Sequence, residues 1–141
     1  MEQAGFEYGK PCNRIIRTPA DAADACSEMV GLETESFAVL SVNAKHGMIC
    51  SEIVTNGILD GTLIHPREVF RCAMRHNAKS IVVLHNHPSG DPSPSSEDIK
   101  ITRQLVEAGR VVGIPVMDHV VVSKRGHKSL RECGVADFSR N

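Results

Sequence analysis

The chain is organised around residues 81–98, which read Ile81-Val82-Val83-Leu84-His85-Asn86-His87-Pro88-Ser89-Gly90-Asp91-Pro92-Ser93-Pro94-Ser95-Ser96-Glu97-Asp98. The opening apolar run is short and is followed by turn-forming residues, a pattern typical of a buried strand. His85 and His87 come at the carboxyl end of this strand. Because side chains two residues apart project from the same face of a strand, we expect both imidazoles to point to one place.

A helix is predicted to begin directly after the loop. From Asp98 onward, Ile101, Leu105 and Ala108 recur at spacings of three, four and three, which indicates the buried face of an amphipathic helix. Asp98 lies on that same face, one turn ahead of Ile101. A carboxylate that points inward costs free energy unless it is paired or bound to a metal.

The two histidines and this aspartate together predict a metal site. Two neutral imidazoles and one carboxylate are a common set of three protein ligands for a catalytic zinc, with the fourth position left for water. A purely structural role is the alternative: Ser95 can cap the helix with Asp98 three residues later, and histidines at a strand end can be exposed polar residues. On two elements joined by one loop, the residues favour a zinc ion bound by His85, His87 and Asp98, and a capping role for Ser95 is compatible with it.

The spacing of these residues resembles the motif of a known enzyme family. His85-x-His87, seven further residues, Ser95, two more and Asp98 resemble the JAMM (MPN-plus) metalloprotease motif, and the fuller string from His85 to Asp98 resembles its RadC branch. The resemblance extends from about Ile15 to Gly134. It implies a zinc-dependent metallopeptidase or isopeptidase that uses a metal-activated water on a peptide or isopeptide substrate.

The same resemblance assigns catalytic roles to two further side chains. Glu35-Ser36-Phe37 matches the Glu-x-Phe pattern in which the JAMM general acid/base precedes a strand, so this role is implied for Glu35. By the residues alone Glu33 is an equal candidate, and Glu52 is the next. Ser95 is implied to hydrogen-bond the developing oxyanion.

Asp118 and His119 lie in a later apolar strand and also resemble part of a RadC signature. Because adjacent residues on a strand face opposite sides, the two cannot easily converge on one metal. One of them is a candidate for orienting a zinc ligand, and a satisfied core polar group is the alternative.

Strands and helices alternate along the chain. Strands are predicted at 35–42, with both faces apolar as in an interior strand, at 48–55 as its hairpin partner, at the run before His85, and at 116–123. Thr18 and Pro19 begin an early helix with Ala23, Cys26 and Val30 as its apolar stripe. The pattern predicts an α/β sandwich around a mixed sheet, and the resemblance implies a three-layer α/β/α sandwich with a curved mixed sheet, the MPN (cytidine-deaminase-like) fold.

Two shorter helical segments are also predicted. Pro66 begins a helix whose buried face comprises Val69, Phe70, Ala73 and Met74, and residues 129–133 form a final helical turn. An arginine at every fourth position lines another face of the first of these segments. We interpret that row as a solvated surface, the alternative being a docking surface for an acidic partner.

Length and composition suit one domain, divided as a flexible leader (1–13), a RadC-like domain (14–136) and a tail (137–141). The formal net charge of −1 lacks the excess of positive charge that nonspecific nucleic-acid binding requires. The five cysteines, at positions 12, 26, 50, 72 and 133, form no C-x-x-C pair, which disfavours a zinc knuckle or a disulfide framework. No signal peptide or long apolar run is present, and we expect a soluble cytoplasmic protein without membrane contact.

Two other functions compete with the peptidase. The RadC resemblance suggests a DNA-repair role or membership of a DNA-associated protein complex. The helix-hairpin-helix region usual in RadC proteins has no room before Ile15, so this sequence resembles a catalytic-type domain standing alone, either natural or truncated. A non-catalytic partner-binding module on the same fold is the second alternative, although such modules usually lose the metal ligands. A zinc deaminase would need paired cysteines that this chain lacks.

Overall fold

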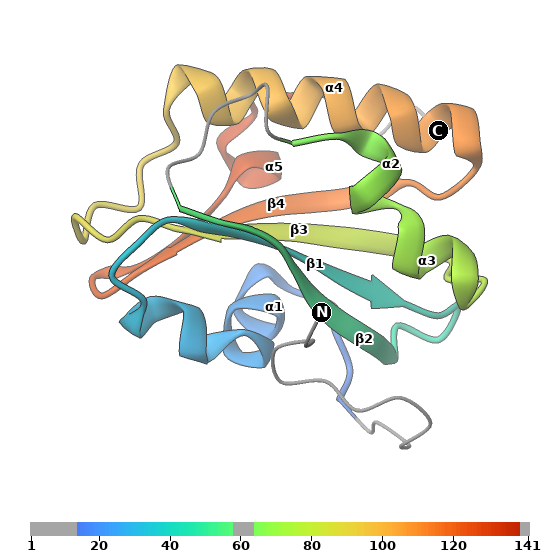
Figure 1. Cartoon of the computed structure of the whole chain (residues 1–141), viewed down its shortest axis with the longest axis horizontal. Coiled ribbons are helices and arrows are strands. Elements are labelled where there is room, and N and C mark those ends of the chain that lie inside the picture. Colours follow the sequence, from blue (N-terminus) through green and yellow to red (C-terminus); the bar gives the residue numbers. More distant parts are fainter. Residues whose placement is uncertain (1–13, 58–63, 139–141) are drawn as a thin grey trace.

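A five-stranded mixed sheet with the strand order β2-β1-β3-β4-β5 lies at the centre of the fold (Figure 1). The computed structural model describes residues 14–57 and 64–138. The helices and strands are, in chain order, α1 (Pro19–Ala25), the 3₁₀ helix η1 (Ser27–Gly31), β1 (Ser36–Val42), β2 (Met48–Asn56), α2 (Pro66–Val69), α3 (Arg71–Arg75), β3 (Ser80–Asn86), α4 (Ser96–Val112), β4 (Val116–Ser123), β5 (Gly126–Ser129) and α5 (Leu130–Cys133). The predicted leader, residues 139–141 of the predicted tail, and Cys12 lie outside the described residues.

The sheet is mixed because one of its four pairings is parallel. β1 is antiparallel to both β2 and β3, β3 is parallel to β4, and β4 is antiparallel to β5. A parallel pair needs a long crossover, and α4 provides it between β3 and β4. The predicted mixed sheet is therefore confirmed.

Helices cover both faces of the sheet. One face carries α2, α3, α4 and α5, whose apolar residues pack with those of the strands into a single core. The other face is covered by α1 and η1, which form a second core with Ala38, Leu40, Val82 and Leu84 among its strand residues (Figure 1). This arrangement confirms the predicted three-layer α/β/α sandwich.

β1 is the interior strand that its sequence predicts. All seven of its residues are buried, with Phe37 and Val39 in one core and Ala38 and Leu40 in the other. An antiparallel neighbour on each side places the amino end of β1 beside the carboxyl end of β3. The residue before β1 is Glu35, so the topology brings this glutamate towards the histidine pair.

The predicted helix starts at Thr18 and Ser95 are confirmed. Thr18 accepts a hydrogen bond from the backbone amide of Asp21 at 3.1 Å, and the Asp21 carboxylate accepts one from the amide of Thr18 at 3.0 Å. Ser95 and Asp98 form the same reciprocal box at the start of α4. A capping box satisfies two of the backbone donors that the first turn of a helix leaves unpaired.

Two expectations about the helices were wrong in detail. The segment from Pro66 forms two short helices instead of one, with Phe70 between them, and Met74 is 50% exposed instead of buried. In the first helical region the buried residues are Ala22 and Met29 together with Cys26, while the predicted Ala23 and Val30 are only half-buried. Helices this short offer too few turns for periodicity to fix the buried face.

The short strand β5 was not predicted. Its sequence, Gly126-His127-Lys128-Ser129, has three exposed residues and no apolar alternation, so only its pairing with β4 defines it. A turn at Lys124 and Arg125 precedes it.

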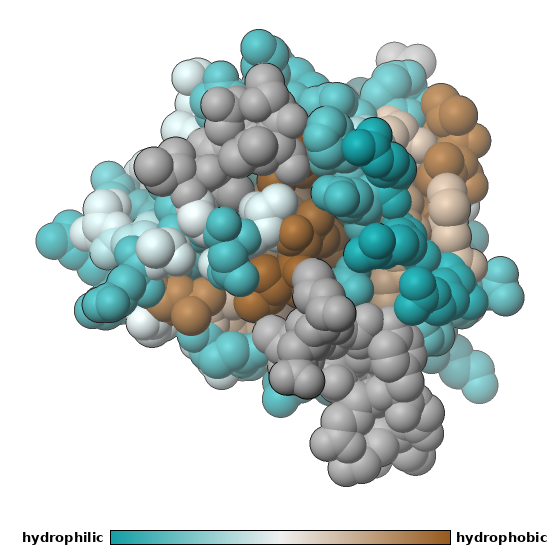
Figure 2. All heavy atoms as spheres, viewed as in Figure 1, coloured by the Kyte–Doolittle hydropathy of each residue, from teal (hydrophilic) through white to brown (hydrophobic). Residues whose placement is uncertain are grey.

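The surface exposes few large apolar side chains. Among the described residues, Ile15, Met74, Val111 and Val112 are the exposed ones. Figure 2 shows a face that is mainly hydrophilic, with apolar residues in a few areas. The arginines Arg67, Arg71 and Arg75 are exposed, as the solvated-surface interpretation expects. In 14–57 and 64–138, none of the helices combines the length and the hydrophobicity needed to cross a bilayer.

Candidate metal centre

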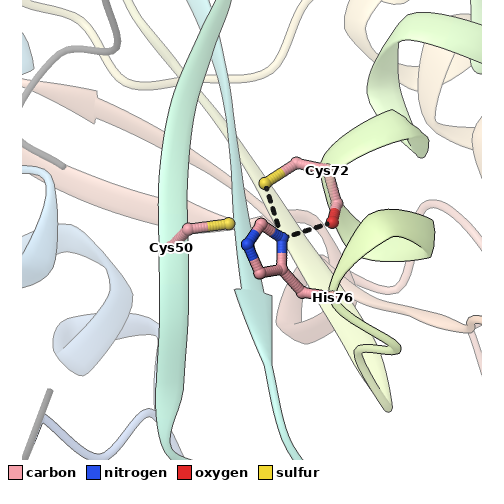
Figure 3. A group of neighbouring side chains, drawn as sticks. All are labelled: Cys50, Cys72 and His76. Atoms are coloured by element: carbon pink, nitrogen blue, oxygen red, sulfur yellow. Dashed lines mark hydrogen bonds between the residues drawn. The ribbon is translucent and has the colours of Figure 1, made fainter. Parts of the chain in front are cut away.

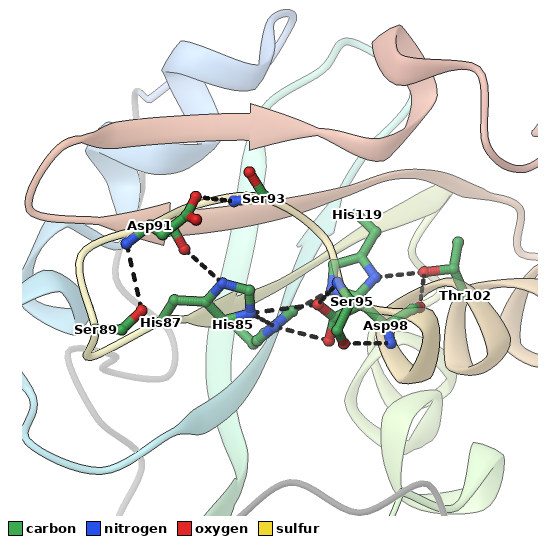
Figure 4. A network of polar contacts seen from close by, with 9 residues as sticks. All are labelled: His85, His87, Ser89, Asp91, Ser93, Ser95, Asp98, Thr102 and His119. Atoms are coloured by element: carbon green, nitrogen blue, oxygen red, sulfur yellow. Dashed lines mark hydrogen bonds and ion pairs between the residues drawn. The ribbon is translucent and has the colours of Figure 1, made fainter.

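Three potential metal ligands converge where β3 ends and α4 begins (Figure 4). Nε2 of His85 lies 2.8 Å from Nε2 of His87 and 3.0 Å from Oδ1 of Asp98, and Nε2 of His87 lies 3.3 Å from Oδ2 of Asp98. The alternation of side chains along β3 brings the two imidazoles together, and the first turn of α4 brings the carboxylate to them. The structure thus places side by side the three residues that the sequence predicts as ligands.

The Asp98 carboxylate is held in place by the helix start. Its Oδ2 accepts a hydrogen bond from the Ser95 amide at 2.7 Å, while the Ser95 hydroxyl oxygen accepts one from the Asp98 amide at 3.1 Å. Burial alone would raise the pKa of Asp98, but the imidazoles of His85 and His87, which can each bond to the carboxylate when Nε2 carries a proton, hold that pKa well below its usual value. The carboxylate is therefore ionised, and its capping role and its place among the candidate ligands coexist.

A buried chain of hydrogen bonds fixes the tautomer of His85. The Thr102 hydroxyl donates to the backbone oxygen of Asp98 at 2.7 Å, so its oxygen accepts from Nδ1 of His119 at 2.5 Å. The Nε2 atom of His119 then carries no hydrogen and accepts from Nδ1 of His85 at 2.8 Å. Full burial lowers the pKa of His119, which keeps this ring neutral. As a result, Nε2 of His85 presents a lone pair to His87 and Asp98.

His87 is oriented by a different partner. Its Nδ1 donates to the backbone oxygen of Asp91 at 2.8 Å, which leaves Nε2 as the acceptor that faces His85 and Asp98. When Nε2 of His87 also carries a proton it donates to Asp98, and this hydrogen bond raises the pKa of His87. Two imidazole lone pairs and a carboxylate oxygen at these distances repel one another unless a proton or a cation lies between them.

These residues fit a tetrahedral zinc. Two nitrogens bound to one zinc at about 2.0–2.1 Å lie roughly 3.3 Å apart, and the observed separation of 2.8 Å is within half an ångström of that value. Both candidate ligand histidines also form a hydrogen bond through their other ring nitrogen, as metal-bound histidines usually do. The donor set, its orientation and its spacing all suit the ion.

Phe37 of β1 packs against the rings of His85 and His119. It lies opposite His85 in the β1–β3 pairing, with ring centroids 6.4 Å apart and nearly parallel planes, and it meets His119 edge-on at 5.7 Å. Aromatic contacts of this kind restrict the rotation of the packed rings. The phenylalanine of the Glu-x-Phe pattern therefore helps to fix the candidate ligands.

Of the three glutamates considered from the sequence, only Glu35 borders the centre. It is half-buried in the wall of a cavity of about 360 Å³ that reaches the candidate ligands. Glu33 is exposed and is not part of this wall, and Glu52 is buried in the middle of β2. The residues that line the cavity are Glu35, His87, Pro88, Ser89, Ser95, Glu97, Asp98 and Ile101.

Asn86, between the two histidines, anchors the backbone on both sides of Glu35. Its side-chain oxygen accepts from the Ser36 amide at 2.6 Å, and its amide group donates to the Thr34 backbone oxygen at 3.0 Å. The residue is almost fully buried. Sequence reasoning missed this role because it depends on the pairing of two strands 50 residues apart.

Asp118 and His119 face opposite sides of β4, as predicted. His119 orients His85, whereas Asp118 accepts hydrogen bonds from the Ser129 hydroxyl at 2.6 Å and from the Arg131 amide at 3.1 Å. Burial raises the pKa of Asp118. This carboxyl borders a separate cavity of about 440 Å³. The wall of that cavity contains none of the predicted site residues, which are Glu35, His85, His87, Ser95 and Asp98. Thr102, which completes the chain to His119, was not anticipated, although it follows Asp98 by one helical turn.

Comparison with known proteins agrees with this geometry. The family model described as RadC-like JAB domain matches residues 16–135, which is most of the chain. The chain belongs to the RadC-like JAB domain family. The RadC resemblance drawn from the motif is thereby confirmed.

Individual RadC-family relatives are longer proteins. This chain is 52% identical to a UPF0758 protein of Symbiobacterium thermophilum, with 94% of the chain and 59% of the relative covered. It is 44% identical to a UPF0758 protein of Thermotoga maritima and to one of Bacillus cereus, covering 63% and 62% of their lengths. The chain thus spans about three fifths of the curated relatives that it matches.

Proposed function

We propose that this RadC-family domain is a zinc-dependent hydrolase of the JAMM type that cleaves peptide or isopeptide bonds. The observation that supports the proposal most strongly is the convergence of three acceptor atoms, from His85, His87 and Asp98, beside a cavity with Glu35 in its wall. Zinc bound there would lower the pKa of a coordinated water to about 7 and polarise the scissile carbonyl.

Glu35 is the general acid/base in this proposal. Amide hydrolysis requires a group that removes a proton from the attacking water and delivers it to the leaving amine, and one carboxylate close to the metal can do both. Glu35 lines the cavity, and hydrogen bonds from and to Asn86 fix the backbone on either side of it. Its position is therefore set by the sheet and not by a loose loop.

Ser95 is the proposed donor to the developing oxyanion. Its hydroxyl oxygen already accepts a hydrogen bond from the Asp98 amide, so its hydrogen remains available for donation. The residue is exposed and lines the same cavity as Glu35. A hydroxyl fixed as a helix cap is preorganised, which is what oxyanion stabilisation requires.

The proposed partner is a polypeptide that carries the scissile amide. The cavity wall contains two carboxylates besides Asp98, from Glu35 and Glu97, which favours neutral or basic residues next to the cleaved bond. A net charge of −1 gives no support to nonspecific DNA binding, so a link to DNA would run through a protein substrate or complex.

The test is cleavage of a mixed peptide and isopeptide library by the zinc-loaded chain, read by mass spectrometry. We expect Glu35→Gln to lower the cleavage rate by about 10²–10⁴-fold while zinc is retained. Glu33→Gln is the matched control and should cleave like the wild type, since Glu33 lies outside the cavity wall. Full activity in Glu35→Gln would remove Glu35 from the mechanism, and an inactive but zinc-loaded wild type would favour a binding module.

A further inference from the structure

A second group of side chains that could hold a metal ion lies away from the first centre. Among residues 14–57 and 64–138, Cys50, Cys72 and His76 each offer a ligand atom, and the three atoms lie within 4.8 Å of one another (Figure 3). Cys50 comes from the edge strand β2, Cys72 lies within α3, and His76 caps the carboxyl end of that helix. None of the three belongs to the candidate centre described above.

The fold brings these residues together from distant parts of the sequence. Cys50 pairs with Ser41 of β1 and faces the side of the sheet that α3 covers. Cys72 and His76 are four residues apart, so they lie on one face of the helix, one turn from each other. Both cysteines are buried and His76 is half-buried, which leaves one side of the group close to solvent.

His76 is oriented as a ligating histidine usually is. Its Nδ1 donates to the backbone oxygen of Cys72 at 3.0 Å and lies 3.6 Å from the sulfur of the same residue. The hydrogen on Nδ1 makes Nε2 the ring nitrogen that can accept a hydrogen bond or bind a metal, and in Figure 3 this second ring nitrogen points towards the sulfur of Cys50. A backbone carbonyl that fixes the tautomer is a common feature around bound metals.

From this geometry we propose that Cys50, Cys72 and His76 form a second zinc site. Thiolate and imidazole ligands in a compact group select zinc or a similar thiophilic cation over Mg²⁺ or Ca²⁺. Binding releases the two thiol protons, and two thiolates with a divalent cation and a neutral imidazole sum to zero charge. A buried site tolerates a neutral cluster far better than an isolated ion.

The surroundings leave a position for a fourth ligand. The Ser41 hydroxyl is fully buried beside Cys50 and has no hydrogen-bond partner among the described residues. A zinc-bound water in this position would give the hydroxyl the partner that it lacks.

Such a site would have a structural consequence. Cys50 lies on the edge strand β2, whereas Cys72 and His76 belong to α3 and its carboxyl end. A metal bound by both elements ties the helix to the edge of the sheet, so metal binding and local folding are linked. The alternative is a pair of buried thiols with His76 acting only as a helix cap.

Cobalt(II) titration of the reduced, metal-free chain separates the two possibilities. Cobalt substitutes for zinc, and only thiolate ligands give an intense sulfur-to-cobalt charge-transfer band in the near ultraviolet. We expect the wild type to develop this band and saturate it at about one equivalent for this site. Asp98→Ala should keep the band, because the first centre contains no sulfur ligand.

Single substitutions test whether the charge-transfer band arises from Cys50, Cys72 and His76. Cys72→Ser should abolish it, and Cys26→Ser, which removes a buried thiol from the opposite core, should leave it unchanged. His76→Gln keeps both buried thiols in place and should weaken cobalt binding at least tenfold, so it tests the site even if Cys72→Ser fails to fold. Absence of the band in the folded, reduced wild type would overturn the proposal, as would a band of full intensity in folded Cys72→Ser.

Discussion

The side-chain oxygen of Asn86 accepts a hydrogen bond from the backbone amide of Ser36 at 2.6 Å, across the β1–β3 pair. The same side chain donates to the backbone oxygen of Thr34, so it holds both neighbours of Glu35. Asn86 thereby connects the strand that carries the histidines to the segment that carries the proposed general acid/base. One buried amide sets the distance between the two halves of the candidate centre.

We expect Asn86→Ala to separate metal binding from catalysis. The variant leaves His85, His87 and Asp98 intact, so zinc content should stay near that of the wild type. Loss of the partner of the Ser36 amide should cost about 1–3 kcal/mol of unfolding free energy and let Glu35 shift, and displacement of a catalytic group by about 1 Å can lower the rate by ~10²-fold. Zinc content and cleavage rate are measured on the same preparation; unchanged cleavage would show that Glu35 needs no such anchor.

The His119–Thr102 pair should control zinc affinity without contacting the ion. Thr102→Val keeps the volume of the side chain but removes the oxygen that accepts from Nδ1 of His119, so the tautomer of His85 is no longer fixed. Loss of such an outer partner typically weakens metal binding by about 10–100-fold. Competition with a chromophoric chelator measures the affinity.

Asp118→Asn is the control for that experiment, because Asp118 is adjacent to His119 in sequence but faces the opposite side of the sheet. Its zinc affinity should match the wild type. An equal loss of affinity in both variants would mean that general loosening of β4, and not the hydrogen-bond chain, weakens the centre.

Zinc binding at the first centre should strengthen as the pH rises. Asp98 raises the pKa of His87 in the metal-free protein, so below that raised value a proton occupies the ring and zinc must displace it. The apparent affinity should increase with pH up to the His87 pKa and then level off. A titration from about pH 5.5 to 8.5 spans the ordinary histidine range on both sides, and Cys72→Ser is used so that the thiol cluster does not contribute. A flat affinity over this range would contradict the expected competition.

Gly109 allows α4 to approach the chain that follows it. A Cβ atom at this position would lie 2.6 Å from the backbone oxygen of Ile114 and 3.3 Å from Phe70. Alanine would improve helix propensity by about 1 kcal/mol, but overpacking against a backbone oxygen costs about 1–3 kcal/mol, so we expect a net loss. Urea unfolding measures the change in the free energy of unfolding of Gly109→Ala, and Lys100→Ala, at an exposed position of the same helix, is the control. A stabilised Gly109→Ala would show that the contact relaxes freely.

The candidate ligands could be predicted from sequence because local geometry determines them. His85 and His87 share a face of one strand, Asp98 lies on the buried face of the next helix, and one loop joins the two elements. The interior position of β1 followed from apolar residues on both of its faces. These features depend on residues within one strand, or on two consecutive elements joined by a single loop.

The surroundings of the site could not be predicted in the same way. His119 meets His85 through parallel strand pairing across 34 residues, and Cys50 meets Cys72 only when α3 packs on the sheet. The absence of a C-x-x-C pair made a thiol site look improbable, but spacing along the chain does not report distances in the fold. Likewise β5 is defined by its partner and has no apolar pattern of its own.

The most direct test of the first centre is a crystal structure of the zinc-loaded chain with anomalous diffraction recorded at the zinc edge. We predict an anomalous peak about 2.0–2.2 Å from Nε2 of His85, from Nε2 of His87 and from a carboxylate oxygen of Asp98. Any peak at Cys50, Cys72 and His76 would be a separate one, so the two centres are judged independently. A zinc-loaded crystal with these three residues in place and no peak between them would contradict the account.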